Sequence, residues 1–314
     1  MRFVNYNYIR KKSFGFLCIV LSTIFWGCGN RGGQKILQET PISGTIHISV
    51  DESFKPIIDQ QIKVFESSFP DAKVIAHYKS EANCFRDLAD DSARMIIVTR
   101  ELNREEEKFY QNSFHYVPKF DLLAFDAIAV IVNNRSADTI LTMSKIRSIL
   151  SDSVKGPIQA VMDGVSATST VRYVIDSVLN GRLPGKNVVA ARSSEQVINF
   201  VANNENAIGF IGVSWIGDQD DPAQLNFLQR VRVAAIKCDA CGESTYVQPF
   251  QANIAWKRYP MVRGLYYILK ENFKGIGSNF VNFLIYERGQ LIFRRAYLVP
   301  SRMSFEIRDV QMKK

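Results

Sequence analysis

Histidine and cysteine are scarce in this chain, which holds only three histidines and five cysteines in 314 residues. The histidines are His47, His77 and His115, and none has a serine, cysteine or metal-ligand partner at a useful spacing. Serine–histidine hydrolysis and zinc-dependent hydrolysis both need such partners. The sequence therefore gives no support to an enzyme, and it predicts neither a metal site nor a cofactor.

An apolar run long enough to cross a membrane is also missing. The apolar segment near the N-terminus extends from Phe14 to Trp26, and a membrane-spanning helix needs roughly 20 such residues. The segment follows the basic triplet Arg10-Lys11-Lys12, as the apolar core of an export signal does. These features predict export of the chain.

Gly27-Cys28 ends this segment and resembles a lipoprotein cleavage box, although Phe25 stands where an aliphatic residue is usual. We expect residues 1–27 to be a lipoprotein signal peptide and Cys28 to receive lipid. Residues 28–43 would form a flexible tether because they begin with a glycine-rich stretch. The protein would then be periplasmic and anchored to a membrane of the cell envelope. A plain secretory peptide with an incidental cysteine is the alternative.

A long basic run is absent outside the N-terminal segment. The whole chain has a net charge of +8, but residues 1–27 contain four of the basic residues and no acid. The remaining residues have 35 basic and 31 acidic side chains, a net charge of +4. Nucleic acid is therefore not an expected partner.

Two of the remaining cysteines, Cys238 and Cys241, have the spacing of a redox or zinc motif. Zinc would need two further ligands, and no cysteine or histidine lies nearby. A redox centre would want a helix that begins at the first cysteine, whereas Gly242 follows the second. A local disulfide or two idle thiols in a surface loop are the interpretations left open.

The first third of the chain repeats the order strand, loop, helix three times, which is typical of an α/β fold. Residues 45–50, 73–78 and 94–98 predict strands, and Asn103 with Glu106 resembles a capping box for the helix after the third. Each loop after a strand carries a hydroxyl, at Ser53, Ser80 and Thr99. Ligands bind at the carboxyl ends of strands in open α/β sheets, so these hydroxyls predict one polar cleft.

A fourth hydroxyl-bearing loop spans Asp163 to Tyr173 and leads into an apolar-periodic helix. Its hydroxyl residues are Ser166, Thr168, Ser169 and Thr170. The first turn of a helix leaves N–H groups unpaired at the positive end of its dipole, so hydroxyls placed there favour anion binding. One of them acting only as a helix cap is the alternative.

The rest of the chain continues the alternation of strands and helices. We expect strands at 125–133, 207–211, 231–236 and 264–269, and helices at 144–150, from 193, at 278–286 and at 289–296. The strand at 125–133 is long enough to cross between two lobes.

Six segments resemble, in order, motifs of the periplasmic phosphate-binding proteins of ABC importers. They are Thr99-Arg100-Glu101-Leu102 with Glu105-Glu106, then 125–133, 163–169, 207–212, 259–263, and Gly289-Gln290 with 297–300. The resemblance implies a two-lobed type II periplasmic-binding-protein (Venus flytrap) fold of the α/β class. Each lobe would be a mixed sheet flanked by helices, with the ligand in the cleft between them. Residues 44–126 and 248–314 would form lobe 1, and residues 127–247 lobe 2.

The resemblance also implies a function and a set of ligand contacts. The chain would bind inorganic phosphate as a monomer and deliver it to the transmembrane subunits of an ABC permease. The contacts carried over are Ser53, Phe54, Ser80, Ser166 and Thr168, with Arg100 as the cation. Ser169 and Thr170 are added from position alone. A sensory or adhesive lipoprotein and a receptor for another oxyanion such as sulfate remain alternatives.

Two departures from the family pattern affect the predicted site. Val161 and Met162 stand where the family often has an arginine, so Arg172 or Arg100 would have to compensate. Residues 94–98 lack the family's aspartate, which accepts the proton of hydrogen phosphate and so rejects sulfate. The acids that remain as substitutes are Glu81, Glu52 and Asp51.

Overall fold

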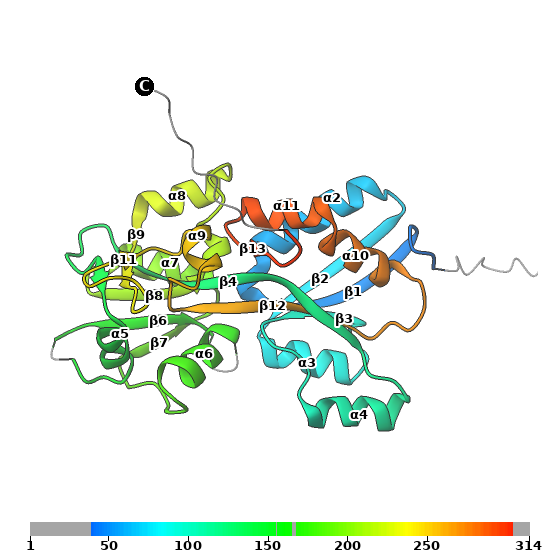
Figure 1. Ribbon diagram of the computed structural model, residues 1–314, viewed down its shortest axis with the longest axis horizontal. Coiled ribbons are helices and arrows are strands. Elements are labelled where there is room, and N and C mark those ends of the chain that lie inside the picture. Colours follow the sequence, from blue (N-terminus) through cyan, green and yellow to red (C-terminus); the bar gives the residue numbers. More distant parts are fainter. Residues whose placement is uncertain (1–38, 155, 165–167, 304–314) are drawn as a thin grey trace, which may run out of the picture. The chain divides into compact units, whose positions relative to one another are not determined.

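The computed structural model describes residues 39–154, 156–164 and 168–303 (Figure 1). The expected signal peptide, the lipid site Cys28 and the ligand contact Ser166 lie outside these residues. Among the described residues, no helix is both long and apolar enough to cross a membrane.

Three parallel strands, which the sequence predicts, form the first part of the sheet. They are β1 (Gly44–Asp51), β2 (Ala72–Lys79) and β3 (Met95–Val98), and β1 lies between the other two. All four residues of β3 are buried, as its continuous apolar sequence predicts. The carboxyl ends of these strands therefore meet at one edge of the sheet.

The helices of this part follow their strands. A short 3-10 turn, η1 (Glu52–Phe54), leads into α2 (Lys55–Ser68), and α3 (Glu81–Ala89) follows β2. The capping box of α4 (Arg104–Phe114) is confirmed, because Asn103 and Glu106 each accept from the other's main-chain N–H. Helices α3 and α4 lie on one side of the sheet, and α2 lies on the other (Figure 1).

The strand β4 (Lys119–Asn133) joins two groups of strands. It begins six residues before the predicted strand, and its first part pairs antiparallel with β12 (Val262–Leu269) through Ala127. Its last part, from Ile128, pairs with β8 (Ala207–Gly212). Ten described strands form this sheet, and its main path runs β2-β1-β3-β12-β4-β8-β6-β7.

The second group of strands carries the predicted anion loop. The strand β6 (Gln159–Asp163) lies between β8 and β7 (Val188–Ala191) and is parallel to both. The loop after β6 leads into α6 (Ser169–Tyr173), which continues as a π-helical turn, η2 (Val174–Val178). The other helices here are α5 (Met143–Leu150) and α7 (Ser194–Asn203), close to their predicted positions.

Smaller elements follow β8. They are η3 (Val213–Trp215), α8 (Pro222–Arg230), β9 (Val231–Val233), β10 (Ala235–Lys237) and β11 (Tyr246–Val247). The single strand predicted at 231–236 is wrong, because Ala234 turns its N–H to Val130 and splits the segment. The strand β9 pairs with β4, whereas β10 joins β11 and β5 (Ile140–Leu141) in a separate small sheet.

The C-terminal part packs against the first group of strands. It consists of α9 (Gln251–Ala255), β12, α10 (Ile276–Ile285), α11 (Glu287–Arg295) and β13 (Val299–Pro300). Helices α10 and α11 lie beside α2, on the opposite side of the sheet from α3 and α4 (Figure 1). Aromatic rings fill this layer, since Phe65 of α2 contacts Phe280 and Phe283 of α10.

Of the alternatives for the CxxC segment, the structure has the local disulfide. Cys238 and Cys241 are bonded, and the bond closes the turn between β10 and β11. Cys84 is a free, buried thiol of α3. Burial raises its pKa, so it is not a reactive thiolate.

Candidate functional site

Thr168 caps the first turn of α6. Its hydroxyl accepts from the Val171 N–H at 3.2 Å and donates to the Asp163 carbonyl at 2.9 Å. Gly164 permits this turn, because its φ is +82° and an added Cβ would lie 2.4 Å from the Thr168 methyl group. One hydroxyl of the loop is therefore used as a cap, and Ser169 and Thr170 are left for other contacts.

Ser169 binds a carboxylate that comes from the other group of strands. Its N–H and its hydroxyl donate to the two Asp51 oxygens at 3.2 and 3.0 Å. Asp51 ends β1 and also accepts from the Ser53 N–H at 3.0 Å. All three residues are at most 1% exposed. Donors at the start of α6 and after β1 thus already hold an oxyanion, which is a carboxylate of the chain itself.

Asp163 is a second buried carboxylate that hydroxyl groups surround. Ser53 donates to it at 2.8 Å, and Ser194 and Thr170 lie at 3.3 and 3.5 Å. Ser194 begins α7 and also donates to Glu52 at 2.9 Å. We call Asp51, Ser53, Asp163, Ser169 and Thr170 the carboxylate–hydroxyl network. It ties the loops after β1 and β6 to each other.

Arg263 of β12 supplies the buried positive charge of this network. Its Nη1 donates to the Ser169 hydroxyl at 2.9 Å, and its Nε pairs with Asp126 at 2.8 Å. The Phe54 ring packs against the guanidinium, with the centre of the ring 4.9 Å away. Asp126 comes from β4 and is fully buried. The buried cation therefore comes from β12, and β4 supplies its partner Asp126. It takes the place of the arginine that the family often has before the anion loop and that this chain lacks.

Burial makes the acids of this region weak. It raises the pKa of Asp163 to about 6, with a further contribution from the Asp51 charge. It raises the pKa of Glu52 to about 7, and the Asp163 charge adds to the shift. The pKa of Asp51 is also raised, by burial and by Glu81. The region therefore takes up protons close to neutral pH.

A cavity of about 260 Å³ opens beside the network, and we call it the strand-end cavity. It is lined by Glu52, Tyr78, Lys79, Ser80, Asp163, Gly164, Thr168 and Arg192. Lys79 forms an ion pair with Asp87. The Arg192 guanidinium has no hydrogen-bond or ion-pair partner in the described parts of the chain. Arg192 is therefore the cation in this cavity that is free to bind an anion.

Arg100 borders a second cavity, of about 290 Å³, together with Glu81, Phe85 and Arg172. Its guanidinium donates to both Glu106 oxygens, at 2.7 and 2.8 Å, and stacks on the Phe85 ring at 3.6 Å. Arg172 pairs with Glu81 at 2.6 Å and donates to the Thr99 hydroxyl at 2.7 Å. Burial opposes ionisation of Glu81, but the donors from Arg172 and Thr99 outweigh it and lower the pKa.

The predicted contacts thus fall into three places. Ser53, Ser169 and Thr170 belong to the carboxylate–hydroxyl network, and the Phe54 ring packs against the Arg263 guanidinium. Ser80 and Thr168 line the strand-end cavity, and Ser80 stands at the start of α3 without a side-chain cap bond. Arg100 is 6 residues from its partner Glu106 and borders the other cavity.

Sequence reasoning assigned no role to Arg263, Asp126, Arg192 or Ser194. Arg263 did lie in a segment that resembles the family, and Asp126 lay in the predicted crossing strand. The signal for Arg192 was its place just after the strand β7, at the same edge of the sheet as Asp163. Ser194 shows no such signal, because a serine that begins a helix is common.

The mixed sheet shared by two strand groups, with polar and charged side chains at the strand ends, is the fold of a type II periplasmic binding protein. A family model described as the PBP superfamily domain matches residues 37–288, and the chain belongs to this family. A comparison with curated proteins gave no match.

Three solved structures share the fold. The first is described as a putative phosphate ABC transporter substrate-binding protein with bound phosphate from Clostridium perfringens. It is 20% identical at a TM-score of 0.67, and the match covers 82% of this chain and 99% of that one.

The second is an ABC-type phosphate transport receptor from Vibrio cholerae, 19% identical at a TM-score of 0.59, with 81% and 99% covered. The third is a possible phosphate binding protein from Planctomyces limnophilus DSM 3776. It is 18% identical at a TM-score of 0.55, with 82% and 93% covered. At these identities the likeness shows the fold.

Proposed function

We propose that the protein binds inorganic phosphate, or a similar tetrahedral oxyanion, at the strand-end cavity and delivers it to an ABC importer. The observation that carries the proposal is the oxyanion already held in the network beside this cavity, the Asp51 carboxylate. Ser53 and Ser169, from loops of different strand groups, donate to the Asp51 carboxylate. The phosphate-binding descriptions of the similar structures point to the same ligand class.

The ligand would contact groups that face the strand-end cavity. Ser80 lines it with a hydroxyl that makes no cap bond, Thr168 lines it at the start of α6, and Arg192 supplies a guanidinium without a partner in the described residues. Charge-assisted hydrogen bonds contribute roughly 1.5–3 kcal/mol each, so a few of them give micromolar or tighter binding after the costs of ordering. Ser53, Phe54, Ser169, Thr170 and the loop residue Ser166 would complete the contacts as the loops adjust around the ligand.

The acids in the cavity would set the choice of anion. Glu52 and Asp163 line it, and a carboxylate accepts a proton from hydrogen phosphate. Sulfate has no proton to give at neutral pH, so it would face an unrelieved repulsion. Residues 94–98 have no acid to accept the proton of hydrogen phosphate. In this chain that role would fall to Glu52, Asp163 and the nearby Asp51.

Ligand binding would be read as closure of two lobes. We assign residues 44–126 and 248–314 to lobe 1 and residues 127–247 to lobe 2, because β4 changes its pairing partner between Ala127 and Ile128. A ligand held by both lobes binds the closed form better and shifts the population towards it. The permease would recognise the closed form, and no bond would be made or broken.

The remaining parts of the proposal concern location. Residues 1–27 would direct export and be removed, and lipid on Cys28 would anchor the protein, as a monomer, to a membrane of the cell envelope. Residues 28–43 would tether the binding domain within reach of the permease.

Calorimetry on the purified protein with phosphate and with sulfate tests the function. We expect one phosphate per chain, bound at least about tenfold more tightly than sulfate, which corresponds to about 1.4 kcal/mol. Equal affinities would remove the phosphate assignment. Incubation with phosphate esters is the matching test for an enzyme, and turnover there would contradict a pure receptor.

A further inference from the structure

A third cavity, of a different character, lies at β9 and shares no lining residue with the strand-end cavity. Its volume is about 570 Å³, more than twice that of the strand-end cavity. Its wall includes Ile140, Val213, Ile216, Leu228, Phe250 and Tyr297. Cavities of roughly 300–1,000 Å³ with apolar walls are typical of small-molecule sites. We call it the β9 cavity.

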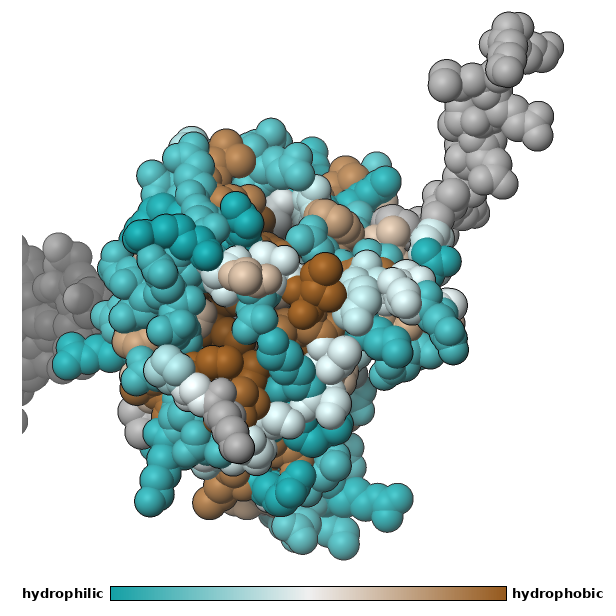
Figure 2. All heavy atoms as spheres, turned by 90° about the vertical axis from the view of Figure 1, so that its left-hand side faces the viewer, coloured by the Kyte–Doolittle hydropathy of each residue, from teal (hydrophilic) through white to brown (hydrophobic). Residues whose placement is uncertain are grey.

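The rim of the β9 cavity exposes large apolar side chains to solvent. Ile140 is 58% exposed and Phe250 is 51% exposed. Figure 2 views the end of the molecule that carries α5, α8, β9 and β11, and apolar side chains gather in the middle of this face. Single exposed apolar residues are normal, but exposure around a concave apolar wall marks a site that a ligand covers.

One charged residue, Arg232, lines the β9 cavity, and no acid does. Arg232 lies between Val231 and Val233 on β9 and is exposed. Within the described ranges its guanidinium has no hydrogen-bond or ion-pair partner. This cation next to apolar walls favours a ligand that has an anionic head and an apolar body.

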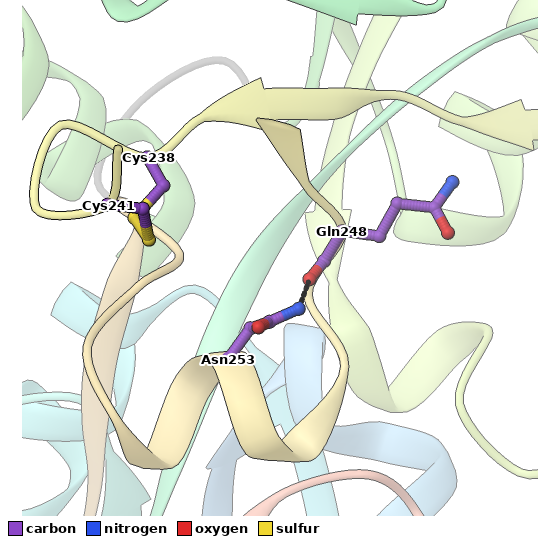
Figure 3. The surroundings of a disulfide bond; sticks show 4 residues. All are labelled: Cys238, Cys241, Gln248 and Asn253. Atoms are coloured by element: carbon purple, nitrogen blue, oxygen red, sulfur yellow. Dashed lines mark hydrogen bonds between the residues drawn. A yellow bond between two sulfur atoms is a disulfide. The ribbon is translucent and has the colours of Figure 1, made fainter. Parts of the chain in front are cut away.

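The walls of the β9 cavity are held by hydrogen bonds and by the disulfide. The Gln248 side chain donates to the Val233 carbonyl at 2.7 Å, and the Ala235 N–H donates to the Thr139 carbonyl at 2.9 Å. Figure 3 shows that the Cys238–Cys241 disulfide closes the hairpin that leads to Gln248, whose carbonyl accepts from the Asn253 side chain at 3.0 Å. The site is therefore formed before a ligand arrives.

We infer that the β9 cavity is a second binding site, for an amphipathic monoanion: a carboxylate or sulfonate head on an aliphatic or aromatic body. The head pairs with Arg232 at the rim, and the body covers Ile140 and Phe250 and fills the wall between them. An inorganic oxyanion has no apolar surface to bury, so it does not select this site. The inference does not depend on which anion the strand-end cavity takes.

Two fluorescent probes distinguish the contribution of the anionic head to binding from that of the apolar body. The anionic probe is 8-anilinonaphthalene-1-sulfonate, and the neutral probe is N-phenyl-1-naphthylamine, and both brighten in an apolar site. We expect saturable binding of both to the full protein, with dodecanoate displacing both. Arg232→Gln should weaken binding of the sulfonate about tenfold and that of the neutral probe less than twofold, since only the sulfonate forms the charged contact.

Matched variants locate the site. Ile140→Glu, at a position that is 58% exposed, should weaken sulfonate binding at least about tenfold by placing a like charge at the rim. Arg135→Gln removes the same charge from an exposed ion pair with Glu205 that does not line the cavity, and should leave both probes unaffected. All three variants should keep the phosphate affinity of the unaltered protein.

Several outcomes would overturn the inference. The first is that neither probe binds saturably. The second is that Ile140→Glu and Arg232→Gln leave sulfonate binding unchanged. The third is that Arg135→Gln weakens sulfonate binding as much as Arg232→Gln does. Loss of phosphate binding with intact probe binding would instead count against the proposed function alone.

Discussion

The Asp51 carboxylate receives both the N–H and the hydroxyl of Ser169, at 3.2 and 3.0 Å, across 118 residues of sequence. Asp51 ends β1, and Ser169 begins α6, so this contact joins the two strand groups. The positive end of α6 favours a negative charge at this point. The chain thus places one of its own acids where the sequence predicts a bound anion.

Replacing Asp51 tests how much this contact stabilises the fold. Asp51→Ala leaves three buried donors without their acceptor, two from Ser169 and the Ser53 N–H, and should lower the free energy of unfolding by about 1–3 kcal/mol. Asp51→Asn keeps an acceptor oxygen and should lose less. Urea unfolding measures both, with the exposed Asp71→Ala as a control expected to change little.

Stability should fall as the pH rises from about 4 to about 7. Burial raises the pKa of Glu52 to about 7 and that of Asp163 to about 6, so the folded protein binds more protons than the unfolded chain in this interval. Their contribution is fully present below the unfolded pKa values and is lost as the pH passes the folded ones. Glu52→Gln should remove about 3 kcal/mol of this change, because its pKa rises from 4.5 to about 7 on folding and each unit is worth about 1.4 kcal/mol. A Glu52→Gln protein with an unaltered pH profile of unfolding would contradict the assignment.

Removing one partner of the buried pair Arg263–Asp126 should lower the stability of the protein much more than removing one partner of an exposed pair. Arg263→Met leaves Asp126 buried without its partner and should destabilise the protein by about 3–5 kcal/mol. Arg135→Met removes a pair whose side chains are 78% and 55% exposed, and should cost less than about 1 kcal/mol. Similar losses from the two variants, measured by denaturant titration, would show that Arg263 is not the buried anchor described above.

Arg192 and Arg100 give opposite expectations for phosphate. Arg192 faces the strand-end cavity without a partner, whereas Arg100 is held by Glu106. Arg192→Gln should weaken phosphate binding at least about tenfold, and Arg100→Gln less than threefold, because only the first removes a free charge from the cavity. Calorimetry checks this, and the reverse order would restore the assignment of Arg100 from sequence.

The disulfide should contribute modestly to stability. Cys238 and Cys241 close a loop with a sequence separation of 3, and the chain-entropy model gives about 2 kcal/mol for a loop this short. The double variant Cys238→Ser/Cys241→Ser should lose no more than that in thermal or urea unfolding. A larger loss would mean that the bond also fixes the neighbouring segment through Gln248.

The sequence predicted the order of strands and helices well where apolar periodicity was strong. The buried strand β3 and the capping box of α4 are examples, because local residue patterns decide both. It missed β6 and β7, which lack the continuous run of large apolar residues that marks β3. It also merged β9 and β10, since only the contact of Ala234 with Val130 separates them.

The site was predictable in position but less so in chemistry. Hydroxyls after strands indicated the edge of the sheet where Ser53, Ser80 and Thr168 now lie. The choice of cation was not predictable, because Arg263 reaches Ser169 from a strand 94 residues away in sequence. Neither was the raised pKa of Asp163, which depends on burial that only the folded chain creates.

The continuity of β4 limits how the protein can move. Between its two pairing partners the strand stays bonded, since the Ile128 N–H donates to Met261 and the Ile128 carbonyl accepts from Tyr259. A swivel at one loose residue would break these bonds. In the closure proposed above, rotation of the two strand groups would therefore be shared by several residues of β4. The main-chain bonds on both sides of Ile128 would then favour a small rotation over a wide opening.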